Sequence, residues 1–246
     1  MALAHYSPSQ VRLFLEEPAL WFLRYYGGVF GDVGPKAWRG TAVGKALEMS
    51  LAHPSKPFSE ILQFGLISFD QQAEGEISDA IEIESAKIKL MLEQLQEPMG
   101  KFGGYLGAEI RAETMVDNVE LPVLGYVDFA FDVGDVEIKT TDRCPSKPRL
   151  NHVRQVAFYN KARKRPQTIV YATPKRYAVY EISQGDLDSA WRQSHAALKA
   201  MDRVNHIICE GLRDWRSQAE LYPPRDIDNW LWDNETREAA KEVWGL

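Results

Sequence analysis

The hydrophobic periodicity of the chain changes near residue 105, and this change constrains the fold more than any other feature. Before it, apolar residues recur at the three- and four-residue spacing of helices; after it, apolar and polar residues alternate as in strands. The spacing predicts a helix from Pro8 that Pro18 interrupts, and further helices over residues 18–25, 40–51, 57–74 and 78–96. The alternation predicts strands over residues 108–116, 123–131 and 136–140, joined by turns at 117–118 and 133–135.

The rest of the chain mixes helices and strands. We expect a helix over 150–165, strands over 168–173 and 177–182, and a helix over 186–213. Residues 29–38 are expected to be a loop, and the tail a loop followed by a short terminal helix. This order predicts one α/β domain over residues 1–246. Its expected parts are a mainly helical region over 1–100, a sheet core over 105–185, and a C-terminal helix and tail over 186–246.

Composition narrows the class of protein. Hydrophobic residues make up 45% of the chain and charged residues 26%, which is ordinary for a globular protein. The two cysteines, Cys144 and Cys209, form no CxxC pair, which excludes a zinc knuckle or a four-cysteine iron–sulfur cluster. No apolar run approaches the roughly 20 residues that span a bilayer, and the first residues lack a signal-peptide pattern. We therefore expect a cytoplasmic location and no membrane partner.

Charge is unevenly distributed along the chain. The net charge is −6, yet the segment from Lys139 to Arg176 holds eleven Lys/Arg and only one acid, Asp142. That segment carries +10 and the remainder −16. A local basic face can bind a polyanion such as DNA, because screening limits each surface charge to about 10 Å. The alternative is a solvated, lysine-rich helix.

Two carboxylates and a lysine lie on neighbouring predicted strands. Asp128 ends the stretch Gly125-Tyr126-Val127-Asp128, and Glu137-Ile138-Lys139 follows across a tight hairpin. Glu137 and Lys139 are two apart, so both point to one face. Two carboxylates within reach of one ion suit Mg²⁺ or Mn²⁺, which activates water and neutralises charge on a phosphate, and the lysine can assist. The alternative is an exposed hairpin, although a lone Asp in an apolar strand is costly to bury unless something binds it.

The order of these elements resembles the PD-(D/E)XK nuclease superfamily, and more closely its RecB-like exonuclease branch. Four short motifs over residues 7–182 carry the resemblance, each weak alone but all in the branch's order. They are Ser7-Pro8-Ser9 through Pro18, Arg39-Gly40-Thr41 through Glu48, the pair Gly125–Asp128 and Glu137–Thr140, and Gln155 through Tyr159.

The resemblance implies a restriction-endonuclease-like αβββαβ core with a mixed central sheet flanked by helices. It implies a metal-dependent DNA nuclease, more an exonuclease than a site-specific endonuclease, acting on single-stranded DNA or a double-stranded end in recombination, repair or phage genome processing. The setting would be a bacterial or phage-infected cytosol. No helicase P-loop is present, so a helicase or recombinase partner would be a separate protein. Asp128, Glu137 and Lys139 would be catalytic.

Two departures from the branch affect the cofactors. The cysteine before the branch's proline is Glu17 here, so no iron–sulfur cluster is expected. The histidine of its first-motif helix is Gly44. The expected metal ligands are therefore Asp128, Glu137 and the Ile138 carbonyl, with Glu48 as an additional one; whether one metal or two are held stays open.

Side chains near the metal motif have assigned roles and alternatives. Gln155 and Tyr159 share a helix face and are expected to position the scissile strand, while Arg154 and Lys161, together with Arg163, Lys164 and Arg165, hold flanking phosphates. The alternatives are a core position for Tyr159 and a structural salt bridge for Glu48. Alternation in the first strand places Glu109, Arg111 and Glu113 on an exposed face. The alternative is that one of the two acids approaches the site.

Two other functions compete with the nuclease. A catalytically weak nucleic-acid-binding module that retains the nuclease fold is favoured by Gly44 and opposed by the retained Asp128, Glu137 and Lys139. A domain unrelated to DNA would carry the basic helix only as a solvated face. Nuclease assays distinguish the binding module from a nuclease. Salt-dependent DNA binding distinguishes a DNA-binding protein from a domain unrelated to DNA.

Overall fold

The computed structural model describes residues 3–246, and its contacts divide the chain into two compact units. One unit comprises residues up to 32, 113–125 and 188–246; the other comprises 33–112 and 126–187. The assignment of residues 1–246 to a single nuclease domain stays a prediction. Within the described residues, no helix combines the length and apolarity that a membrane crossing requires.

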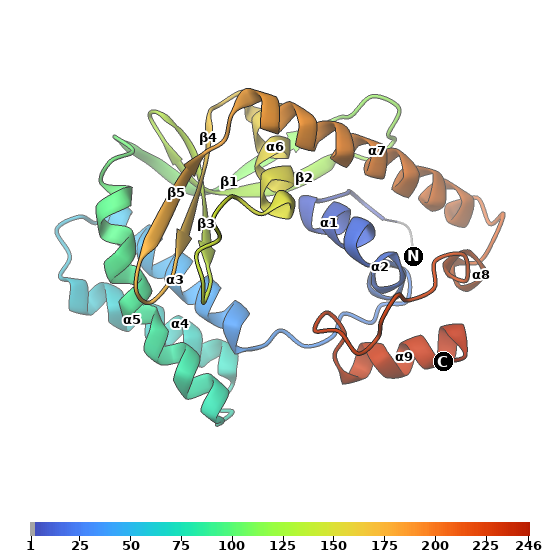
Figure 1. The fold of residues 1–246 in the computed structure, drawn as a ribbon, viewed down its shortest axis with the longest axis horizontal. Helices are drawn as coiled ribbons and strands as arrows, with labels where there is room; N and C mark the ends of the chain where they lie inside the picture. Colours follow the sequence, from blue (N-terminus) through green and yellow to red (C-terminus); the bar gives the residue numbers. More distant parts are fainter. Residues whose placement is uncertain (1–2) are drawn as a thin grey trace. The chain divides into compact units, whose positions relative to one another are not determined.

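A five-stranded mixed sheet forms the centre of the fold and confirms the predicted α/β class. Its strand order is β1-β2-β3-β4-β5 (Figure 1). β2 and β3 pair antiparallel, as do β4 and β5, whereas β3 and β4 are parallel. Parallel neighbours need a crossover, and α6 provides it. The strands are β1 (Tyr105–Thr114), β2 (Val123–Phe131), β3 (Gly134–Thr140), β4 (Gln167–Ala172) and β5 (Tyr177–Glu181).

Helices cover the sheet residues of the 33–112 and 126–187 unit on both faces. Alternation in β2 and β3 sends Phe129, Phe131 and Val136 into a buried apolar cluster with α3, α4 and α5. Figure 1 shows these three helices beside β3–β5 and α6 on the other side. The bounds are α3 (Pro35–Ala52), α4 (Phe58–Ala73), α5 (Asp79–Met99) and α6 (Leu150–Arg163).

Helix α3 begins at Pro35, whereas residues 29–38 were expected to be a loop and the helix was expected to begin at residue 40. Pro35 occupies its first turn, where a missing N–H is harmless. Arg39 on this helix is buried and pairs with the buried Glu84 of α5. On the same helix as Glu84, Lys87 donates to Asp142, which follows β3, at 2.8 Å. These ion pairs fasten α3 and α5 to the chain that leaves β3.

Helices make up most of the other unit. α1 and α2 form as predicted and bury Phe14 and Trp21, whose ring centroids lie 5.1 Å apart. α7 ends at Cys209 rather than Arg213, and α8 occupies part of the tail expected to be loop. The bounds are α1 (Pro8–Glu16), α2 (Pro18–Tyr25), α7 (Gln184–Cys209), which starts in the sheet-bearing unit, α8 (Trp215–Ala219) and α9 (Asn234–Trp244).

Asp135 is a strand residue rather than the predicted turn residue, and it anchors the crossover. It is fully buried and lies opposite Gln167 in the β3–β4 register. Arg163 Nε donates to its Oδ2 at 2.8 Å, and Arg165 Nε donates to its Oδ1 at 3.0 Å. Asp135 therefore ties the end of α6 and the start of β4 to β3.

We predict that Asp135→Ala destabilises the protein by about 3 kcal/mol, because it leaves two partly buried guanidinium groups without their counter-ion. Urea unfolding at neutral pH measures the change. The control is Glu97→Ala, which removes the exposed Glu97–Lys101 pair and should cost far less. Equal losses in the two variants would contradict a structural role for the Asp135 cluster.

Candidate functional site

The site forms where β2 leaves β3. The paired register of these strands runs from Phe131↔Gly134 to Phe129↔Val136. At the next position, Asp128 Oδ2 accepts a 2.8 Å hydrogen bond from the Ile138 backbone N–H. A side-chain carboxylate thus takes the place of a strand carbonyl. This interaction fixes Asp128 against β3.

Glu137 and Lys139 project from the same face of β3, as strand alternation predicts. Lys139 Nζ lies 2.5 Å from Glu137 Oε1. The Glu137 side chain is only 2% exposed, and its Oε2 has no hydrogen-bond partner among the described residues. A buried carboxylate oxygen without a partner carries a full desolvation cost, so this atom indicates a place for a missing cation or donor.

The three groups interact strongly. Burial, and then repulsion by Asp128, raises the pKa of Glu137 to about 8. Burial also raises the pKa of Asp128, against the opposing attraction of Lys139. Burial alone would lower the pKa of Lys139, but Glu137 and Asp128 raise it above its ordinary value. When all three ionise, the cluster holds one uncompensated negative charge.

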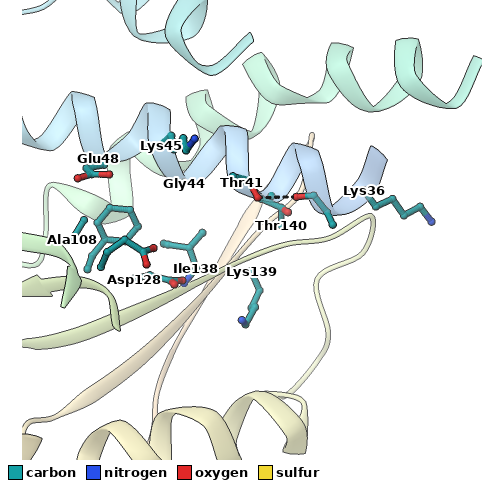
Figure 2. A pocket seen from close by; sticks show the side chains of 14 residues that line it. Lys36, Thr41, Gly44, Lys45, Glu48, Ala108, Asp128, Ile138, Lys139 and Thr140 are labelled. Carbon is teal, nitrogen blue, oxygen red and sulfur yellow. Dashed lines mark hydrogen bonds between the residues drawn. The ribbon is translucent and has the colours of Figure 1, made fainter. Parts of the chain in front are cut away.

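A cavity of about 670 Å³ opens beside this cluster (Figure 2). Its walls come from α3, β1, β2 and β3, and Asp128 and Lys139 line it. Figure 2 shows Glu48 on α3 on the side of the helix that faces Ala108 and Asp128. Glu109 of β1 also lines the cavity. Three elements besides β3 therefore bring a carboxylate to one pocket.

Glu109 was expected on an exposed face of the first strand, with an approach to the site only as the alternative, yet it lines the pocket. Burial raises its pKa, and so do the negative charges of Asp128 and then Glu48. Its backbone φ of 49° lies in the left-handed region, which interrupts the regular alternation expected for the strand. Nothing in the residue order signalled that irregularity.

Gly44 faces the pocket as an open position. A Cβ built on it would meet nothing within 4 Å. Gly44 lines the cavity with Glu48 one turn later on α3. Glycine at this position thus leaves space in the pocket.

Gln155 and Tyr159 on α6 form a local hydrogen-bonded pair. Gln155 Nε2 donates to the Tyr159 hydroxyl at 2.9 Å, and that hydroxyl donates to the Tyr126 carbonyl of β2 at 2.6 Å. Tyr159 is buried; burial raises its pKa, and the charge of Glu137 adds to the effect. The pair therefore packs close to the acidic cluster. Its contact with DNA stays a prediction.

The basic segment contains both cations in internal ion pairs and cations on the surface. Arg163 and Arg165 neutralise Asp135, so neither is a simple surface cation. Lys161 is exposed on α6 and Arg154 is half-buried. The charge count of the sequence thus overstated the cations that face solvent, because it did not separate internal ion pairs from surface charge.

The donor set fits a divalent cation of the Mg²⁺ or Mn²⁺ type. Asp128 and Glu137 each keep one oxygen outside the Ile138 and Lys139 contacts, and hard carboxylate oxygens are what these ions prefer. As the side chains stand, no three His, Cys, Asp or Glu residues within 3–246 are close enough together to hold an ion. Glu48 and Glu109 are exposed and have freedom to rotate. Coordination by these residues or by the Ile138 carbonyl stays a prediction.

Comparison with known proteins gives weak likenesses. No family profile and no curated protein matches the chain. The crystal structure of SSO0001 is 15% identical, with 84% of this chain and 92% of that chain covered, at a TM-score of 0.34. LHK-Exo in complex with dAMP is 14% identical, with 72% and 97% covered, at a TM-score of 0.34. One structural neighbour is thus an exonuclease, but at this TM-score neither likeness supports a conclusion about function.

We predict that Glu137→Gln stabilises the metal-free protein at pH 8 and above. An unfolded glutamate ionises near pH 4.3, whereas folded Glu137 holds its proton to about pH 8. The folded state therefore binds the extra proton between these values, and wild-type stability falls as pH rises through them. The amide removes that loss and should raise the Tm by at least about 3 °C.

Thermal unfolding in EDTA from pH 5 to 9 measures this effect. Glu113→Gln, an exposed glutamate on β1, is the matched control and should leave the pH dependence of the Tm unchanged. A wild-type Tm that follows the same pH curve as the Tm of Glu137→Gln would show that Glu137 carries no folding cost.

Proposed function

We propose that the protein is a metal-dependent deoxyribonuclease that hydrolyses phosphodiester bonds in DNA, acting as an exonuclease. The observation that carries the proposal is the Asp128–Glu137–Lys139 cluster, in which Glu137 is buried with an unpartnered Oε2 and the half-buried Asp128 and Lys139 open to a 670 Å³ pocket. Two neighbouring carboxylates that cannot both ionise at neutral pH without a further cation are costly for folding alone and suit cation binding. The resemblance of the surrounding motifs to the RecB-like branch points the same way.

The side chains have distinct roles in this proposal. Asp128 and Glu137 would hold Mg²⁺ or Mn²⁺, which when bound supplies Lewis-acid chemistry at a phosphate. Lys139 is held against Glu137, so its ammonium group can orient the attacking water and share the charge that develops on the phosphate. The Ile138 N–H keeps Asp128 in place during the reaction.

The basic helix α6 supports DNA as the substrate. It runs directly from the loop after β3, and its Tyr159 packs beside Glu137. Arg154 and Lys161 on this helix would contact phosphates flanking the scissile bond, with Gln155 positioning the strand. The substrate is single-stranded DNA or a double-stranded end, processed in recombination, repair or phage genome processing, with a separate helicase or recombinase where unwinding is needed.

We predict that Lys139→Met and Glu137→Ala each slow DNA cleavage by at least about 100-fold, because the first removes a cation beside the phosphate and the second removes a proposed metal ligand. Labelled single- and double-stranded DNA with Mg²⁺ or Mn²⁺ is the substrate, and EDTA should stop the reaction. The control is Glu113→Gln, which should cleave like wild type.

Equal cleavage by wild type and Glu137→Ala would overturn the nuclease proposal. Salt-dependent DNA binding without metal-dependent cleavage by wild type would instead favour the catalytically weak binding module that Gly44 suggests.

We predict that Lys161→Ala weakens DNA binding and makes the dependence of log K on log salt shallower by about 0.9, the contribution of one phosphate contact. Filter binding at several salt concentrations with EDTA present measures the slope. The control is Lys101→Ala, an exposed lysine after α5. An unchanged slope for Lys161→Ala, or an equal change for both variants, would contradict DNA contact through this helix face.

A further inference from the structure

Three adjacent strands each carry one carboxylate near this pocket: Glu109 on β1, Asp128 on β2 and Glu137 on β3, of which Glu137 is not part of the pocket lining. Glu109 and Asp128 line the cavity, and the Glu137 carboxyl lies against that of Asp128. We propose that Glu109 is a ligand of the metal ion, completing with Asp128 and Glu137 a three-carboxylate site. This inference rests on the proposed function and extends it by naming a ligand that the motif pattern does not contain.

The count of available oxygens supports a third carboxylate. One oxygen of Asp128 accepts from the Ile138 N–H, and one oxygen of Glu137 pairs with Lys139. Each therefore keeps one oxygen outside these two contacts, and the two carboxyls lie against each other. Mg²⁺ and Mn²⁺ prefer six oxygen ligands, so two protein oxygens hold such an ion weakly. Glu109 supplies a further hard oxygen from the strand next to Asp128.

An independent observation points to a ligand at this place. Glu137 Oε2 is buried, and none of the described residues donates a hydrogen bond to it. Only 2% of Glu137 is exposed to solvent. A cation between the three strands would satisfy this oxygen and balance the charge that Asp128 and Glu137 share.

The backbone of Glu109 agrees with a functional role. A non-glycine residue in the left-handed region costs stability, and Glu109 adopts this conformation inside a strand, whereas Glu74 and Lys164 adopt it at helix ends and Asn118 in a turn. Open space at Gly44 across the pocket leaves room for the Glu109 carboxylate, which is exposed and has freedom to rotate toward Asp128. Glycine would suit this backbone better, yet the position holds an acid.

Mn²⁺ binding to the full chain tests the proposal, measured by electron paramagnetic resonance titration and calorimetry without DNA. We expect both Glu109→Gln and Glu109→Gly to weaken Mn²⁺ binding by at least about tenfold. Glu109→Gly accepts the positive φ, so its Tm in EDTA should equal or exceed that of wild type. This variant separates loss of a ligand from loss of folding. Glu113→Gln on the same strand should bind like wild type.

The outcomes distinguish this inference from the proposed function. If both Glu109 variants bind Mn²⁺ like wild type while Glu137→Gln does not, Glu109 is no ligand and the nuclease proposal stands. If Glu109→Gln loses affinity but Glu109→Gly keeps it, Mn²⁺ binds without a carboxylate at position 109 and the inference fails. If wild type and Glu137→Gln bind Mn²⁺ equally, or neither binds it, the metal site itself is wrong.

Discussion

The contact between Asp128 and the Ile138 N–H is the interaction on which the site depends. Antiparallel strands normally continue to pair through backbone carbonyls, but here a carboxylate takes the donor at the point where β2 leaves β3. That exchange brings Asp128 beside Glu137 and Lys139 instead of into solvent. The two carboxyl groups and the lysine then lie close together. Their electrostatic interactions determine which of them are ionised and affect the stability of the metal-free protein.

The surrounding structure holds this unfavourable arrangement in place. On one face of the sheet, α3, α4 and α5 bury a continuous apolar cluster that includes Phe129 and Val136, the last pair before the strands separate. Arg39 pairs with Glu84 inside that layer, and Lys87 reaches Asp142 just beyond the strand that carries Lys139. Packing and ion pairs away from the site thus offset the cost of the acidic cluster.

Residue order was enough to predict the elements and the position of the acidic cluster. The period-two alternation located all five strands to within a few residues, and the spacing of Glu137 and Lys139 gave their common face. The start of α3 was missed because Pro35 was taken as part of a loop rather than as a first-turn residue. Asp135 was taken for a turn residue because only tertiary contacts with Arg163 and Arg165 make its burial favourable.

Other site features were not predictable from residue order, for specific physical reasons. The left-handed backbone of Glu109 depends on how β1 lies against its neighbours, and no local pattern encodes it. The basic run predicted a polyanion surface, but a charge count does not distinguish Arg163, which is bound internally, from the exposed Lys161. Whether a basic residue pairs with an internal acid or faces solvent depends on the tertiary structure.

The parallel pairing of β3 with β4 also limits how the gene can vary in length. Only residues 164–166 separate α6 from β4, and the Asp135 cluster holds both of their ends. One inserted codon there would move β4 one position along β3 and send Tyr171 to the opposite face of the sheet. The segment 143–149 before α6 has no comparable strand register to preserve. Insertions and deletions between β3 and β4 should therefore be tolerated before the crossover helix and eliminated after it.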